Sequence, residues 1–564
     1  MKTKSLLMIL VIMVVGFSSC DLIENGEDNG GTNNIVNSDI TTNTTWESGK
    51  TYVISGSVSV DGATLTIEPG AVIKFEAGAS LHIGYYSNAT LIANGTSSKP
   101  ITFTSTASSP APGAWEGITF WDNSLNSSMQ YCKVQYAGKA TEGAVNVKGC
   151  EITFSNNEVT NAKLYGVMLN YEGYFTAMSG NSFANCGSHP VRISAKYMHT
   201  IGTGNTFTCP ADKGINVYSG DATGNITWRK LDKPYYIEGE IDFDNGTLTI
   251  EPGTVLKFDA DGSLHIGYYN NSTLIANGTS DNKIEFTSSA AVPAAGAWKG
   301  ITFWNNSLNS SMKYCNILYA GTSTEGAVNV KNCAITFENN TINYAKSYGS
   351  LVNYEGSFTS MINNAYSNCG NHPLRISSKY MHTIGTGNTF NCPEGKGVNV
   401  YAEDVTGNIT WRKLDKPYYI EGDIDFDNGT LTIEAGTILK FNADGSLHIG
   451  YYNNSTLIAV GNSSNYIVFT TDASSPAAGA WVGIHLWDNN SANTNFNYCK
   501  FMYAGKGSSS DNTRAALKAS STSFSASNCE FSYSAGWGIY LSNSTYTGTG
   551  NTFNNCALGN QGSN

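Results

Sequence analysis

The sequence predicts an all-β protein whose strands stack as the coils of a solenoid. Within residues 247–278, apolar and polar residues alternate in short runs separated by Gly, Asn or Asp, the period of strands with one buried face. The same stretch recurs at residues 64–95 and 430–461, each copy displaced by 183 residues. No segment has a helical period, and strands this short without hairpin spacing favour solenoid coils over a sandwich.

The chain begins with a predicted targeting segment. Lys2 and Lys4 precede an apolar run over residues 6–15, and small residues lead to Cys20. This run is too short to span a bilayer. The segment resembles the signal peptide of bacterial lipoproteins, which implies removal of residues 1–19 and a lipid on Cys20. An ordinary secretory signal is the alternative.

Residues 20–45 are rich in Asp, Glu, Asn, Gly and Thr. Such a composition cannot bury a core, so a flexible acidic tether is predicted. Acidic residues directly after the lipid-bearing cysteine resemble the signal that sends some lipoproteins to the cell exterior. We therefore expect attachment to the bacterial outer membrane at the cell surface, with the periplasmic face as the alternative.

The composition excludes some classes of protein. With 40% hydrophobic and only 13% charged residues, the body is too apolar to be disordered. The formal net charge is −12, and such a surface repels phosphate backbones. Nucleic acid is therefore not an expected partner.

Three tandem units are predicted to form one rod. Trp115, Trp298 and Trp481 follow the 183-residue period, and the units are placed at residues 46–228, 229–411 and 412–564. At about 23 residues per coil and about 4.8 Å per rung, the rod would be on the order of 100 Å long. The third unit is truncated after Cys556, where the first two continue with a segment ending KYMHTIGTGNTF.

The segments LTIEPGTVLKF, STLIANG, IEFTS, GAWKGITFW, SMKYCNILYAG and NCAITFENN resemble a known family. In this order they are similar to the right-handed parallel β-helix proteins of the pectate-lyase-like superfamily, particularly non-catalytic extracellular members from bacteria. The resemblance covers nearly the whole mature chain and implies a right-handed parallel β-helix. It does not choose an activity, because this fold carries lyases, hydrolases and adhesins.

The cysteines and histidines are the residues that could form disulfides or bind a metal. Eleven cysteines remain after Cys20, and most lie in inward-alternating runs, which predicts small buried hydrophobes, with disulfides as the alternative. His82, His265 and His448 alternate with apolar neighbours, so they are expected at outward polar positions. No metal site and no cofactor are predicted, because no second ligand recurs at a suitable spacing.

The enzyme hypothesis centres on a basic cluster. His189, Arg192, Lys196 and His199 lie close together in the first unit, and the second unit repeats them. Cleavage by β-elimination needs a basic residue and neutralisation of the uronate, often by Ca²⁺ on grouped aspartates, and hydrolysis needs paired carboxylates. Neither pattern is present, so no catalytic residue is assigned, and a polysaccharide lyase or glycoside hydrolase is the alternative function.

The preferred hypothesis is a non-catalytic protein that binds carbohydrate or acts as an adhesin. A tyrosine pair enters a turn in each unit, and a tryptophan on a later strand should also face outward. Flat rings beside Asn, Asp and Ser suit stacking on sugars, and units roughly 40 Å apart would engage one long ligand. A structural surface spacer is the other alternative, since duplication copies aromatics whatever they do. The oligomeric state is left open. The predicted binding residues are Tyr85, Tyr86, Trp121, Tyr268, Tyr269, Trp304, Tyr451, Tyr452 and Trp487.

Overall fold

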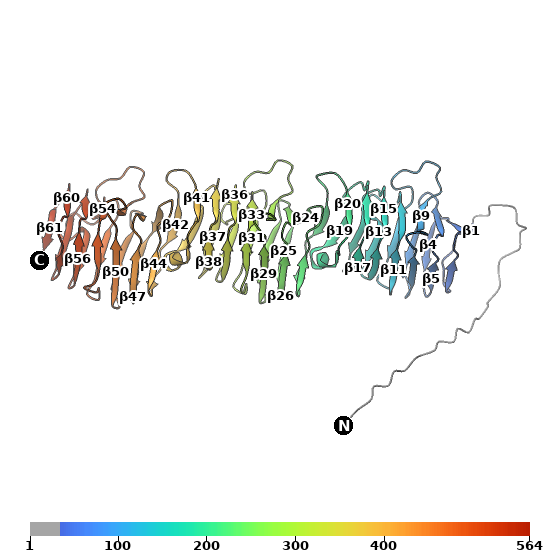
Figure 1. Ribbon diagram of the computed structural model, residues 1–564, viewed down its shortest axis with the longest axis horizontal. Coiled ribbons are helices and arrows are strands. Elements are labelled where there is room, and N and C mark those ends of the chain that lie inside the picture. The colour runs from blue at the N-terminus through green and yellow to red at the C-terminus, as the bar shows by residue number, and fades with distance from the viewer. Residues whose placement is uncertain (1–33) are drawn as a thin grey trace, which may run out of the picture.

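The computed structural model describes residues 34–564 as a rod of about 22 stacked turns (Figure 1). Strands of successive turns pair in parallel throughout the named sheets. The predicted all-β solenoid, one continuous rod, is therefore confirmed. The signal segment, Cys20 and residues 20–33 of the tether lie outside the described residues. The number of tandem units and their boundaries stay predictions from the sequence.

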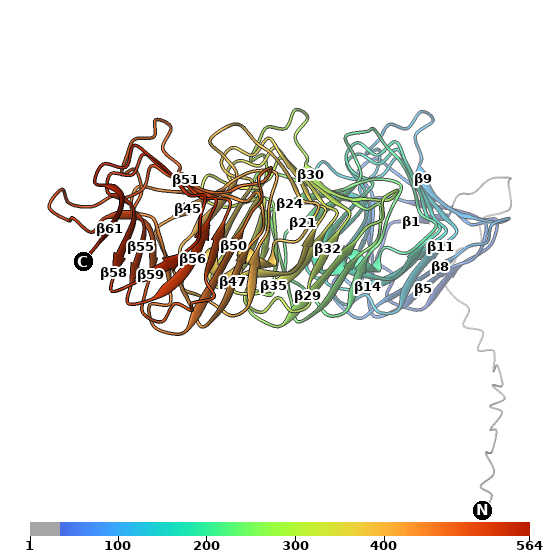
Figure 2. The same cartoon turned by 60° about the vertical axis from the view of Figure 1, so that its left-hand side comes forward.

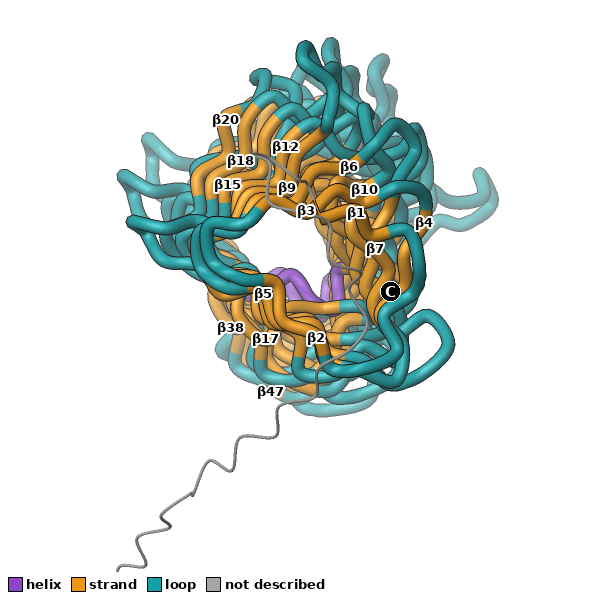
Figure 3. The backbone as a smooth tube through the Cα atoms, turned by 90° about the vertical axis from the view of Figure 1, so that its right-hand side faces the viewer, coloured by secondary structure: helices purple, strands orange, loops and turns teal. Residues whose placement is uncertain are grey.

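Each coil contributes one strand to each of three sides, as the view along the rod shows (Figure 3). The first complete coil contains β3 (Thr51–Ile54), β4 (Ser57–Val60) and β5 (Thr64–Ile67). The next places β6 (Val72–Phe75), β7 (Ser80–Ile83) and β8 (Thr90–Asn94) directly against them. Alternation turns every second side chain inward. One cluster of buried apolar residues follows, running from Ile40 to Ile539.

Where one predicted unit meets the next, strands of both units pair within the same sheet. β21 (Ile215–Tyr218) pairs with β19 (Val191–Ser194) of the first unit and with β24 (Tyr235–Glu238) of the second. This sheet thus has 14 strands, from β4 to β41 (Thr389–Asn391), and a second 14-stranded sheet crosses the next junction. Backbone pairing is therefore continuous across both junctions.

The units nevertheless keep the same orientation about the rod. β5, β29 (Ser272–Asn277) and β50 (Ser455–Val460), from the three units, all lie along the lower side in Figure 1, and they stay on the lower side in Figure 2, where the C-terminal end comes forward. Equivalent turns of the three units therefore face in similar directions.

Two short helices correct the expectation of no helix. η1 (Ala195–Thr200) and η2 (Ser378–Thr383) are 3-10 helices, each at a junction, and each is capped by a serine side chain that accepts from a backbone N–H. At η1 the side formed by β17 (Tyr174–Ser179) is interrupted before β23 (Ile226–Trp228) begins a new sheet. Within residues 34–564, no helix is long and apolar enough to cross a membrane.

The ends of the described chain also differ from expectation. β1 (Asn34–Val36) pairs with β3, and Ile40 is buried and bridged to Val60, so residues 34–45 belong to the solenoid and not to the predicted tether. The polar tail forms β61 (Gly559–Ser563), which pairs with β58 (Trp537–Ser542). The prediction for the cysteines is confirmed, because all eleven in residues 34–564 are free thiols and most are buried.

Candidate functional site

The turns that lead into β8, β29 and β50 carry the predicted tyrosine pairs. In the first, Gly84 adopts a φ of +71°, and a Cβ there would lie 2.5 Å from the carbonyl carbon of Asn123. The Asp61 carboxylate, one coil earlier, accepts hydrogen bonds from two successive backbone N–H groups of the turn, at 2.7 and 3.0 Å. Asp244 and Asp427 hold the other two turns in the same way. A tight glycine and a buried carboxylate thus fix each tyrosine pair.

A tryptophan from the following coil completes each cluster. The ring of Trp121 meets Tyr85 edge to face with centroids 4.9 Å apart, and the equivalent pairs are 4.8 and 4.7 Å apart. The two tyrosines of each turn are 4.5 Å apart in all three units. Such edge-to-face pairs are the favoured aromatic geometry. All nine predicted residues thus meet in three aromatic platforms: Tyr85, Tyr86 and Trp121; Tyr268, Tyr269 and Trp304; Tyr451, Tyr452 and Trp487.

The platforms present rings to solvent on one side of the rod. The second tyrosine is the more open, with 74%, 69% and 67% of its surface exposed at Tyr86, Tyr269 and Tyr452, whereas each tryptophan is half-buried. Each platform turn leads directly into the lower side of Figure 1. About seven to eight rungs of about 4.8 Å separate neighbouring platforms, which is about 35 Å.

The third platform differs from the first two in having no lysine of residues 34–564 over its tryptophan ring. The ammonium groups of Lys148 and Lys331 lie 4.3 Å above the rings of Trp121 and Trp304. In the third unit Ser520 ends the corresponding strand, β55 (Ala515–Ser520). A hollow of about 490 Å³ is found there, lined by Tyr451, Tyr452, Trp487, Asp488, Ser520 and Ser521.

A histidine stacks on the tryptophan of the third platform. The imidazole of His485 stacks on Trp487 with centroids 3.8 Å apart and bonds the Ser520 hydroxyl at 2.8 Å. Burial, with the nearby charges of Lys518 and His448, lowers the pKa of His485 to about 3. The first two units have threonine at this register position, Thr119 and Thr302.

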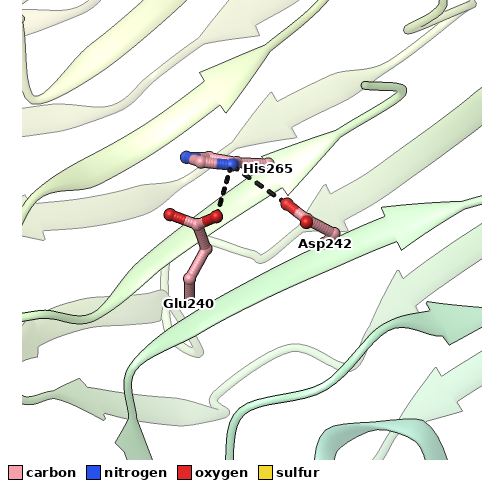
Figure 4. A group of neighbouring side chains, drawn as sticks. All are labelled: Glu240, Asp242 and His265. Carbon is pink, nitrogen blue, oxygen red and sulfur yellow. Dashed lines mark hydrogen bonds and ion pairs between the residues drawn. The ribbon is translucent and has the colours of Figure 1, made fainter. Parts of the chain in front are cut away.

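The three outward histidines are less isolated than expected. His82, His265 and His448 lie on the outer face, as predicted, but all are half-buried. Beside His265 the structure brings Glu240 and Asp242 from the preceding coil (Figure 4). These three form the one group within residues 34–564 that could hold a metal ion. Sequence reasoning missed the carboxylates because they lie one coil back, 23 residues from the histidine in the case of Asp242.

The basic cluster that raised the enzyme hypothesis is largely neutralised. Arg192 pairs with Glu238 at 2.8 Å, and Lys196 pairs with Glu172. His189 bonds the backbone of Gly214, and burial lowers its pKa. The acidic partners come from neighbouring coils, so the cluster offers little free positive charge to a substrate.

A groove lies beside η1, where the lower side of the rod is interrupted. It has a volume of about 660 Å³. Tyr174 and Tyr197 line it with stacked rings 4.9 Å apart, and His199 and Arg229 also face it. The Arg229 Nε atom is buried and has no hydrogen-bond partner among the described residues. Ser357 replaces Tyr174 at the second junction, so this aromatic pair is not repeated there.

These features define the protein as a parallel β-solenoid with aromatic clusters repeated on its outer surface. A family model for the pectate-lyase-like β-helix domain matches residues 38–124, 220–347 and 403–514, and the chain belongs to this family. The predicted resemblance to pectate-lyase-like β-helix proteins is thereby confirmed. No curated protein matches the chain.

Proposed function

We propose that the protein is a non-catalytic carbohydrate-binding protein, or adhesin, of the bacterial cell surface, and that the three aromatic platforms are its binding sites. A pectate-lyase-like β-helix fits a carbohydrate-related function. The observation that carries the proposal is the same edge-to-face cluster at three places, each with an exposed tyrosine ring.

The arrangement suits a long polymer better than a small sugar. Each platform offers one ring face or edge beside polar groups, which gives only a weak individual contact. Three such contacts about 35 Å apart on one side of a rigid rod would act together on an extended chain, and linked sites can gain about 10²- to 10⁴-fold in avidity. The third platform is expected to contribute most, because its hollow of about 490 Å³ is larger than the hollow of about 340 Å³ at the first platform and no lysine of the described chain covers its tryptophan.

Retention on immobilised polysaccharides tests the platforms. Replacing Tyr86, Tyr269 and Tyr452 together by Ala is expected to abolish retention, and Tyr452→Ala alone should weaken it more than Tyr86→Ala alone. Tyr354→Ala is the matched control, because this tyrosine is 70% exposed and belongs to no platform. Retention that survives the triple variant would remove the platforms from the proposal.

The same incubations separate binding from cleavage. Hydrolysis needs two carboxylates, and of the described residues that line the groove beside η1 none is Asp or Glu. Elimination needs a basic group. The basic residues of the groove are His199 and Arg229, whose Nη1 atom lies 3.5 Å from Glu251 Oε1, so a lyase is the second candidate function. New unsaturated ends that disappear in Arg229→Ala would establish the lyase and overturn the non-catalytic proposal.

We also propose that a lipid on Cys20 attaches the protein to the outer membrane. The lipoprotein-like signal segment supports this. Cys20→Ser is expected to move the protein from the membrane fraction to the soluble fraction, and protease treatment of intact cells should digest the wild type if it faces the exterior. An unchanged amount of protein in the membrane fraction would contradict the lipid anchor. It would not affect the proposal that the platforms bind carbohydrate.

A further inference from the structure

Two neighbouring strands of the second unit place three potential metal ligands side by side. In β25 (Glu240–Asp244), Ile241 and Phe243 are fully buried, so Glu240 and Asp242 share the outer face. β28 (Ser263–Ile266) pairs with β25 in parallel, and its register sets His265 directly beside Asp242. The fold therefore brings an imidazole and two carboxylates together on one rigid sheet.

The three side chains converge on one point (Figure 4). The Nδ1 atom of His265 is 3.0 Å from Asp242 Oδ1 and 3.7 Å from Glu240 Oε1, and all three ligand atoms lie within 4.8 Å of one another. A tetrahedral zinc ion with bonds of about 2.0–2.1 Å separates its ligands by about 3.3 Å. The two separations from the histidine, 3.0 and 3.7 Å, bracket this value, so the imidazole and each carboxylate are already spaced as ligands of one ion.

We propose that Glu240, Asp242 and His265 bind one zinc ion, with water in the fourth position. Imidazole and carboxylate together suit zinc better than calcium or magnesium, which prefer oxygen ligands alone. Binding would replace the proton between His265 and Asp242 by the metal. It would also neutralise two carboxylates that now lie close together.

The surroundings are those of a supported site. The Ser263 hydroxyl donates to Glu240 Oε2 at 3.2 Å, which leaves Oε1 toward the histidine. Such outer partners orient metal ligands. The Glu240 side chain is 47% exposed, so the ion can enter from solvent on that side. The Asp242 side chain is only 20% exposed and is held more firmly against the sheet.

The first unit of the chain is a natural negative control. Ser57 and Ser59 occupy the positions of the two carboxylates, next to His82 on the paired strand. The Nδ1 atom of His82 accepts a hydrogen bond from the Trp121 ring at 3.2 Å. By contrast, the Trp304 ring nitrogen in the second unit is buried without a partner among the described residues, because His265 turns to Asp242.

The third unit has only part of the arrangement. His448 Nδ1 bonds Asp425 at 2.8 Å, but the shorter Asp423 takes the place of glutamate and accepts from the Ser446 hydroxyl at 2.6 Å. These residues do not bring three ligand atoms together. The expected stoichiometry is therefore one zinc ion per chain.

Calorimetric titration of the chelator-treated full-length protein with Zn²⁺ tests the site, and Co²⁺ absorption reports its geometry. We expect one saturable equivalent and the visible spectrum of tetrahedral Co²⁺. Loss of an outer-shell partner costs about 10- to 100-fold in affinity, so Asp242→Asn and His265→Ala, which remove direct ligands, should weaken binding at least that much. His82→Ala and His448→Ala are the matched controls and should bind as the wild type does.

Three results would overturn the proposal: no saturable binding to the wild type, unchanged binding in both ligand variants, or loss of binding in the His448 variant instead. Asp242→Asn keeps the shape of the side chain, and an unchanged unfolding temperature of the metal-free variant excludes misfolding as the cause of a loss. No polysaccharide is present in this assay, so its outcome is independent of the proposed carbohydrate binding.

Discussion

Trp298→Ala is expected to destabilise the rod by about 3–5 kcal/mol, the range for removing a large aromatic side chain from a core. The Trp298 ring is fully buried and stacks on Phe258 with centroids 4.4 Å apart and ring planes 9° apart. Its indole N–H donates to the carbonyl of Leu318 at 2.8 Å. The variant would leave a cavity and would also lose this hydrogen bond.

Denaturant unfolding followed by circular dichroism measures this loss. Because each coil contacts only its neighbours, the damage should be local, and the middle of the rod should unfold at a lower denaturant concentration than the rest. Trp304→Ala is the control, since that ring lies on the outer face half-buried, and a loss of about 1 kcal/mol is expected. Equal losses in the two variants would mean that stacking on Phe258 is not what stabilises this part of the core.

The fold could be predicted because its signal is local and repeated. Alternation in short runs determines which side chains point inward, and the 183-residue period shows that the pattern continues along the chain. Trp115, Trp298 and Trp481 were visible as markers of that period. Their stacking on phenylalanines in the core became visible only in the structure.

Polar residues of the interior could not be predicted in the same way. Asn340 is buried, yet its side chain accepts from the backbone of Cys315 and donates to that of Met312, and its own N–H donates to Asn364. In sequence such asparagines resemble turn residues. Their buried position is stable because the coils above and below satisfy them, and a spacing of 24 residues between the asparagines is the one signal that could have indicated it.

The junction helices escaped prediction for a different reason. A six-residue 3-10 helix is too short to show an apolar period, and η2 begins where the Ser377 hydroxyl accepts from the backbone N–H of Lys379. The cluster around Arg192 looked basic in sequence because its acidic partner Glu238 lies 46 residues away and meets it only between coils. Contacts between coils were therefore the part that the linear pattern did not reveal.

The candidate site was predicted in part. The tyrosine pairs follow an alternating run into a turn, so their exposure follows from the strand period, and the tryptophans follow strands in the same manner. The strand period did not predict which residue lies over each tryptophan ring. It depends on the register with the next coil, which puts lysine over Trp121 and Trp304 but serine next to Trp487.

His485→Thr is expected to make the protein less sensitive to acid. In the folded state the pKa of His485 is about 3, whereas the unfolded chain protonates near 6.5. The unfolded state therefore binds more protons between these values, and stability falls as the pH falls from about 6.5 toward 3. One histidine contributes at most about 1.4 kcal/mol per pH unit, so the wild type should lose about 2–3 kcal/mol more than the variant between about pH 6.5 and pH 4.5.

Threonine is the informative replacement because Thr119 and Thr302 occupy the same register position in the first two units. At pH 7 the variant should be close to the wild type in denaturant unfolding, and the two curves should separate only on acidification. The groups that face His485 are Lys518 and His448, both cationic when protonated, and Lys506, Asp511 and Arg514 line the same hollow. Because the charge of Lys518 already opposes protonation of His485, added salt should reduce the difference between the two proteins. Parallel loss of stability in both down to pH 4.5 would show that other groups, and not this histidine, set the response to acid.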